Sequence, residues 1–147
     1  MSKETRVKVQ ANHRYNASAE TIYETFLDPK KAAKFMFATF TGKMIKAEID
    51  PKVGGNFLFV DRRQDGDAAH YGKYTRLEKP NNISFVFAVQ KDAAEQDPVS
   101  IDIKELPKGC EVTLTHEVKE DYAHLKDRIQ QGWDSILDGL GAALRKR

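Results

Sequence analysis

Most of the chain consists of short runs in which apolar and polar residues alternate, the pattern of strands with one buried face. The first run spans residues 7–15, where Val7, Val9 and Ala11 alternate with polar residues. Six further runs follow, at 45–49, 56–61, 70–76, 83–89, 99–103 and 110–116. Because short turns join these six runs and parallel pairing would need long crossovers, they predict an antiparallel meander.

Turn-forming residues separate the six runs. Asp50–Gly55 ends in two glycines that can take a positive φ, and Asp65-Gly66 is typical of a hairpin turn. Pro80–Asn82 and Pro107–Gly109 predict two more turns, and the polar stretch 90–97 is the longest predicted loop.

Two short helices are predicted between the first run and the meander. Ser18 is a suitable N-cap, and Ile22 and Phe26 lie on one face of the helix that follows it. Asp28-Pro29 ends this helix, and a second one is expected from Lys30 to about Phe35. An apolar loop follows, so Phe35, Met36, Phe37 and Phe40 form either a plug over the core or a lid over a ligand entrance.

The end of the chain, from about Tyr122 to Leu144, has the spacing of an amphipathic helix. Its apolar stripe consists of Leu125, Ile129, Trp133, Ile136, Leu137, Leu140 and Leu144. At ~1.5 Å per residue the helix is about 35 Å long, enough to cross the whole sheet. Gly132, Gly139 and Gly141 are costly in a helix interior, and they indicate close backbone packing or space beneath the helix.

Composition narrows the class of protein. The 147 residues are expected to form one α+β domain over 1–147, and 24 basic against 22 acidic residues leave a formal charge of +2. This balance favours no nucleic-acid partner. Cys110 is the single cysteine, which excludes an intrachain disulfide. The polar start and the lack of an apolar run of roughly 20 residues predict a cytoplasmic protein without membrane insertion.

Several local motifs, in this order and spacing, resemble the helix-grip fold of the SRPBCC (START-like) superfamily, in particular its branch of activators of the heat-shock protein 90 ATPase. They are Tyr15–Tyr23, Asp28-Pro29, Asp50–Phe57, Gly72-Lys73-Tyr74, Leu114-Thr115-His116 and Gly132-Trp133. The resemblance implies a curved antiparallel sheet of about seven strands wrapped around the C-terminal helix. Members of this superfamily bind lipids, polyketides, sterols and similar compounds. One departure is that the family usually has a tryptophan soon after the second short helix, where this chain has Phe35, Met36 and Phe37.

The sequence contains none of the standard catalytic or phosphate-binding signatures. Its four histidines have no metal-ligand spacing, so neither a metal nor a cofactor is expected. The polar residues expected to face inward are Asp61, His70, Tyr74, Arg76 and His116. Either they have polar partners in the core, or they line a cavity, or their strands are shifted in register and they do not face inward. His70 and His116 are the candidates for acid–base catalysis, because imidazole titrates near neutral pH.

A cavity between the sheet and the C-terminal helix is therefore the expected site. Its predicted lining is Phe35, Phe37, Phe57, Phe59, Asp61, His70, Tyr74, Arg76, Phe85, Phe87, Leu114, His116, Trp133 and Leu137. Three functions are compatible with this site. The first is binding of a small hydrophobic ligand, lipid- or polyketide-like. The family name implies the second, regulation of a chaperone ATPase in a stress response, and the third is a cyclase or hydrolase using the same cavity. Either a monomer or a homodimer fits the sequence.

Overall fold

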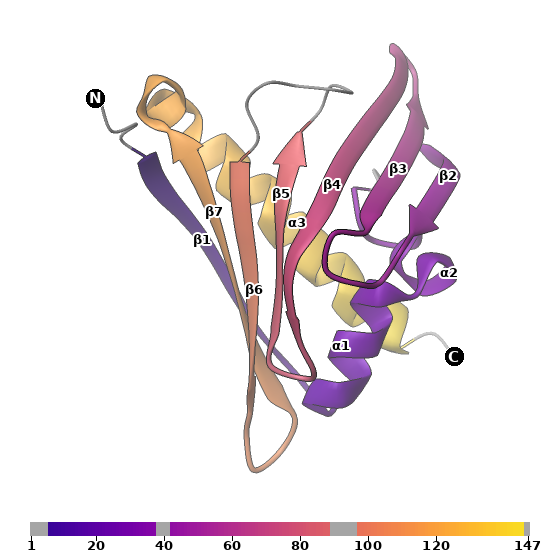
Figure 1. The fold of residues 1–147 in the computed structure, drawn as a ribbon, viewed down its shortest axis with the longest axis vertical. Helices are drawn as coiled ribbons and strands as arrows, with labels where there is room; N and C mark the ends of the chain where they lie inside the picture. The colour runs from indigo at the N-terminus through magenta and orange to yellow at the C-terminus, as the bar shows by residue number, and fades with distance from the viewer. Residues whose placement is uncertain (1–5, 38–41, 89–96, 146–147) are drawn as a thin grey trace.

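The computed structural model describes residues 6–37, 42–88 and 97–145. Phe40, Val89 and most of the predicted loop 90–97 lie outside these ranges. Within them, one sheet, two short helices and a long C-terminal helix follow one another in the expected order (Figure 1). The α+β class and the helix-grip arrangement are thus confirmed.

All seven strands belong to one antiparallel sheet with the order β1-β7-β6-β5-β4-β3-β2. The strands are β1 (Arg6–Tyr15), β2 (Lys43–Ile49), β3 (Asn56–Arg63), β4 (Gly66–Glu78), β5 (Asn82–Ala88), β6 (Asp97–Glu105) and β7 (Cys110–Lys119). The meander runs from β2 to β7, and β1 pairs with β7 over its whole length, from Arg6 opposite Lys119 to Tyr15 opposite Cys110. Two segments from opposite ends of the sequence thereby become neighbours.

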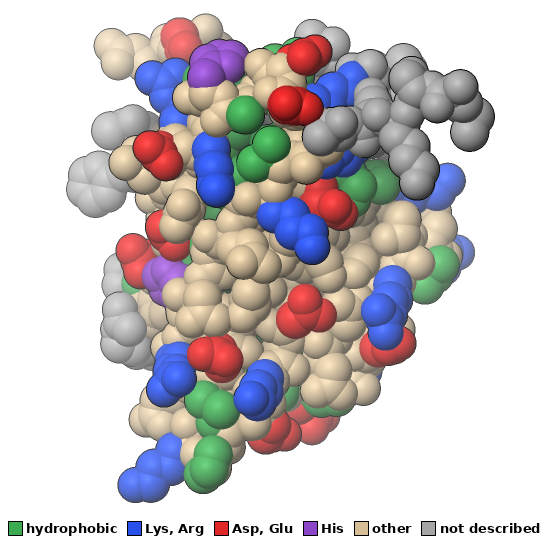
Figure 2. All heavy atoms as spheres, turned by 90° about the vertical axis from the view of Figure 1, so that its left-hand side faces the viewer, with side chains coloured by type: hydrophobic (Ala, Val, Ile, Leu, Met, Phe, Trp, Pro, Cys, Tyr) green, Lys and Arg blue, Asp and Glu red, His purple; other side chains and the backbone are tan. Residues whose placement is uncertain are grey.

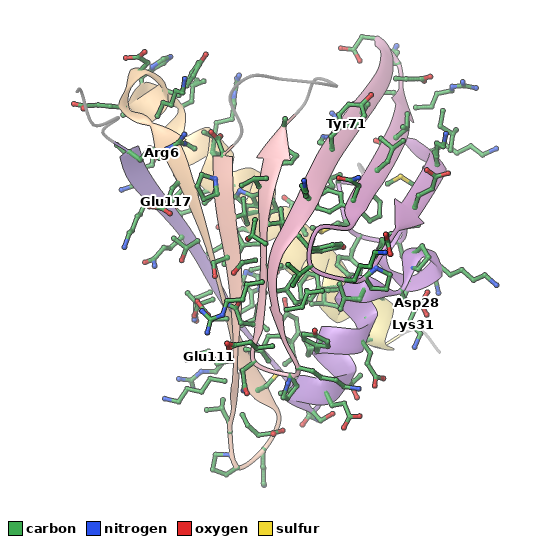
Figure 3. All side chains as sticks on the ribbon, viewed as in Figure 1. Arg6, Asp28, Lys31, Tyr71, Glu111 and Glu117 are labelled. Carbon is green, nitrogen blue, oxygen red and sulfur yellow. The ribbon has the colours of Figure 1, made fainter. Side chains whose placement is uncertain are left out.

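The two short helices begin at side-chain caps. Ser18 Oγ accepts a hydrogen bond from the Thr21 amide at 3.1 Å at the start of α1 (Ala19–Leu27). Asp28 Oδ1 accepts from the Lys30 amide at 2.9 Å at the start of α2 (Pro29–Ala32), where Figure 3 labels Asp28 and Lys31. The second helix is shorter than predicted because the chain leaves it after Ala32 and continues in turns to Phe37.

The C-terminal helix also begins later than predicted. Residues Glu120–Leu125 form a 3₁₀ helix, η1, and the α-helix α3 spans Lys126–Arg145. Residues in η1 are mostly exposed, whereas the apolar stripe is buried from Trp133 to Leu140. Short 3₁₀ segments are frequent at the ends of α-helices. From η1, α3 crosses one face of the sheet diagonally, and α1 and α2 lie near its C-terminal end (Figure 1).

Two β-bulges correct the predicted faces of β2 and β4. The register shifts between Met44 and Lys46, and Ile45 is 41% exposed rather than buried. A second shift lies between Tyr74 and Arg76. A bulge inserts one extra residue and so reverses the alternation beyond it. Arg76 therefore points away from the core and pairs with Glu78, so its expected place in the cavity was wrong.

The core fills the space between the sheet and the helices. Its fully buried side chains include Phe59, Phe85, Leu114, Leu137 and Leu140. The Tyr15 hydroxyl donates to the Leu137 carbonyl at 2.7 Å, which ties the middle of α3 to β1. Burial raises the pKa of this hydroxyl, and the nearby Asp138 raises it further, so Tyr15 remains a hydrogen-bond donor.

Candidate ligand cavity

A cavity of about 740 Å³ lies between α3, the strands and the turn that follows α2. Its wall is formed by Lys34, Phe35, Phe37, Arg63, His70, Phe87, His116, Ile129, Gly132, Trp133, Ser135, Ile136 and Gly139. This volume is within the range of small-molecule sites, about 300–1,000 Å³.

Phe37 forms the centre of an aromatic group on the cavity wall. Its ring stacks on His70 at a centroid distance of 4.3 Å and on Phe87 at 5.1 Å, with Trp133 edge-on at 5.7 Å. Phe37 has a φ of +58°, a left-handed conformation that costs a non-glycine residue about 1–2 kcal/mol. The ring contacts and a hydrogen bond from Arg63 to the Phe37 carbonyl, at 3.3 Å, offset this strain.

His116 lies on the cavity wall and takes part in a chain of hydrogen bonds. The Trp133 indole N–H donates to His116 Nδ1 at 2.9 Å, and His116 Nε2 lies 2.9 Å from Asp97 Oδ2. Arg6 completes the chain, with its guanidinium 3.1 Å from Asp97 Oδ1 and 3.0 Å from the Glu117 carbonyl (Figure 3).

This chain determines the tautomer of His116. An indole N–H can only donate, so Nδ1 is the acceptor and the Nε2 proton is directed at the Asp97 carboxylate. Burial lowers the pKa of His116, while Asp97 opposes the shift, so the ring is neutral at pH 7. The lone pair that a general base would use is occupied by Trp133, which makes His116 a residue that orients Trp133.

His70 is differently placed. It is 9% exposed, and no described residue is within hydrogen-bonding geometry of its Nδ1. Burial lowers the pKa of His70, the nearby Arg63 lowers it further, and the carbonyls of Phe59 and Ala68 and the Asp61 carboxylate oppose the shift. The result is a neutral imidazole that packs flat against Phe37.

The charged residues on the wall are Lys34 and Arg63. Arg63 Nε donates to Asp61 Oδ2 at 3.0 Å; the Asp61 side chain is 1% exposed and that of Arg63 is 33% exposed. Lys34 is exposed, and no ion pair joins it to another residue in the described ranges. No carboxylate of a described residue lines the cavity. Across the described ranges, no three His, Cys, Asp or Glu side chains are grouped to hold a metal ion.

The predicted lining residues divide into four groups. Those on the wall are Phe35, Phe37, His70, Phe87, His116 and Trp133. Those buried in the core away from the wall are Phe57, Phe59, Tyr74, Phe85, Leu114 and Leu137. Asp61 is buried beside Arg63, and Arg76 is outside.

Other wall residues were not predicted. Ile129 and Ile136 belong to the apolar stripe of α3, and the glycines of that helix indicated space beneath it. The sequence therefore contained a signal that could have placed both isoleucines on the cavity wall. The pattern contained no signal for Lys34, Arg63 or Ser135, because nothing in their spacing places them at a cavity.

A sequence profile described as "Activator of Hsp90 ATPase homolog 1-like protein" matches residues 16–145. The chain belongs to this AHSA1-like family. The matched segment begins directly after β1 and includes all cavity-lining residues.

Solved structures share the fold of this AHSA1-like protein. An AHSA1-like protein from Aeromonas hydrophila is 23% identical, with a TM-score of 0.81 over 95% of this chain and 92% of that one. A protein from Chromobacterium violaceum is 22% identical, with a TM-score of 0.78 over 92% and 96%. A protein of unknown function from Staphylococcus aureus is 18% identical, with a TM-score of 0.82 over 97% and 96%.

No curated protein matched the sequence of this AHSA1-like chain. Among the described residues, none of the helices has both the length and the apolar character needed to cross a bilayer.

Proposed function

We propose that this AHSA1-like protein binds a small hydrophobic ligand, lipid- or polyketide-like, between the sheet and α3. The observation that carries the proposal is the cavity of about 740 Å³, with four aromatic side chains and two isoleucines on its wall. Small-molecule sites are mostly apolar, with a few polar groups that orient the ligand. Here those polar groups are two histidines, Ser135, Lys34 and Arg63.

The geometry of the histidines favours binding over catalysis. His116 Nδ1 accepts the indole proton of Trp133, and its other nitrogen faces Asp97. His70 is stacked against Phe37 and has no carboxylate or hydroxyl bonded to its ring among the described residues. A general base needs an available lone pair and a partner that orients it. Neither histidine combines the two, so a cyclase or hydrolase reaction has less support.

The family description suggests regulation of a chaperone ATPase as an alternative. Exposed large apolar residues within the described ranges are Ile45 in β2, Val53 in the turn between β2 and β3, and Tyr122 in η1. Figure 2 shows acidic and basic side chains interspersed on one face, with apolar ones only in small patches. A partner-binding surface usually has a contiguous apolar centre. The described surface therefore supports a ligand in the cavity more than a protein partner.

A larger side chain at position 132 should narrow the cavity without disturbing the core, and this substitution tests the proposal. Gly132 lies on the wall, and a Cβ added there would meet no neighbouring atom within 4 Å. We expect Gly132→Leu to fold and to lose the ligands detected by native mass spectrometry and by thermal shift against hydrophobic metabolites. Gly132→Ala is the matched control and keeps them. Ligand binding that is equal in the leucine variant and the wild type would refute a ligand in this cavity.

A further inference from the structure

We propose that the ligand is an amphipathic anion whose acidic head group binds Arg63 and Lys34, while its hydrocarbon part lies along the aromatic wall. The inference rests on the proposed binding function and adds a chemical class to it. It starts from the distribution of charge. Both charged residues on the cavity wall are cations, and no described carboxylate lies on the wall to neutralise them.

Arg63 has donors left over for a ligand. Its Nε donates to Asp61 and one Nη2 hydrogen to the Phe37 carbonyl. A guanidinium carries five N–H donors, so about three remain, including both on Nη1. Guanidinium donors of this kind can bind a carboxylate or phosphate with two parallel hydrogen bonds.

Asp61 positions this guanidinium. The carboxylate is buried and bonded to Nε, so it holds the Arg63 side chain against the wall instead of leaving it free in water. Arg63 and His70 both line the cavity, so the positive charge of Arg63 is placed beside its apolar volume. A fixed cation with unused donors beside an apolar volume is suited to an acid that carries a hydrophobic body.

Lys34 supplies the second positive charge. It follows α2 and lies on the same wall, where it has no acidic partner among the described residues. An ammonium group with no ion pair is available to a head group at the mouth of the cavity. The lining contributed by α3 includes the apolar side chains of Ile129, Trp133 and Ile136.

The chain contains a built-in reporter for the test. Trp133 is its single tryptophan, lies on the cavity wall and is 4% exposed. Its fluorescence can therefore follow titrations with dodecanoate, dodecanol and dodecylamine, each kept below its micelle concentration. We expect dodecanoate to bind about tenfold more tightly than dodecanol, the ratio that one charge-assisted hydrogen bond supports, and more tightly still than dodecylamine. A parallel titration with monododecyl phosphate shows which acidic head group is preferred, and either acid exceeding the alcohol supports the proposal.

Variants locate the head group. Arg63→Gln and Lys34→Gln should each weaken dodecanoate binding about fivefold to tenfold and change dodecanol binding less than twofold. Arg62→Gln is the matched control, because the Arg62 side chain is 63% exposed and pairs with Asp67 away from the wall. Arg63→Gln removes the guanidinium that pairs with the buried Asp61 and can impair folding. Circular dichroism therefore checks that this variant is folded. The exposed Lys34→Gln gives the answer independently of that variant.

The outcomes separate the two proposals. Equal binding of the acid, alcohol and amine would overturn the anionic class and leave hydrophobic ligand binding intact. The anionic class would also be overturned if Lys34→Gln and a correctly folded Arg63→Gln both bound dodecanoate as tightly as the wild type. If none of the four compounds binds, both proposals fail.

Discussion

At the scale of single residues, Trp133 combines packing with a hydrogen bond that few core residues make. It is 4% exposed, and its indole N–H donates to a buried imidazole nitrogen. Trp133→Phe should keep most of the packing but leave His116 Nδ1 without its donor. Leaving one buried acceptor unsatisfied costs about 1–3 kcal/mol. Urea unfolding followed by far-ultraviolet circular dichroism measures this loss, since the variant lacks the tryptophan signal.

A double-mutant cycle separates this hydrogen bond from packing. His116→Leu removes the acceptor, and in that background the loss of the indole N–H leaves no unsatisfied ring nitrogen. We therefore expect the double variant to lose less free energy of unfolding than the two single variants together. Additive losses would mean that the contact between Trp133 and His116 contributes no coupling energy.

At the scale of elements, the glycines of α3 have opposite roles. Gly132 has open space where a Cβ would stand, whereas a Cβ on Gly139 would lie 2.9 Å from Phe35 Cβ. Gly132→Ala should raise the free energy of unfolding by up to ~1 kcal/mol, through helix propensity alone. Gly139→Ala should lower it, because α3 and the segment after α2 would have to separate. Thermal and urea unfolding of the two variants test this contrast, and equal effects of the two substitutions would contradict it.

Elements were predictable to the extent that period and capping determine them. Alternation placed all seven strands, Ser18 placed the start of α1, and Asp28-Pro29 placed the end of α1 and the start of α2. The prediction continued the alternation of β4 through the unrecognised bulge between Tyr74 and Arg76, and so placed Arg76 on the wrong face. Asp97 was assigned to a loop, yet it is the first residue of β6 and the carboxylate partner of His116.

The candidate site was less predictable than the fold, because tertiary packing rather than local sequence determines its lining. The aromatic residues predicted for the inner face of the strands are buried, apart from the partly buried Phe87. Whether each fills the core or borders the cavity depends on the angle of α3. Arg63 lies at the end of β3 and Lys34 in a turn, and only the folded chain brings them to one wall. Side chains that meet through tertiary packing leave no local spacing signal.

At the scale of the whole molecule, the two buried histidines link stability to pH. Burial holds the pKa of both His70 and His116 below the ordinary value of 6.5. Below about pH 6.5 the unfolded chain therefore binds more protons at these residues than the folded chain does, and the free energy of unfolding falls as the pH falls. Above that value both states carry neutral imidazoles, and this contribution to stability is complete.

The free energy of unfolding is measured with urea at a series of pH values between about 7.5 and 5, in steps of roughly half a pH unit, which covers the range in which histidine titrates. His70→Phe should flatten the acid slope, because it removes a titrating group and keeps a flat ring against Phe37. The same variant also removes a ring nitrogen that no described residue bonds, so it should not lose stability at pH 7.5. Tyr71→Phe, at the next position of β4 (Figure 3), retains all four histidines and should keep the wild-type profile. An acid slope that is as steep in His70→Phe as in the wild type would show that burial of this imidazole does not control the pH dependence.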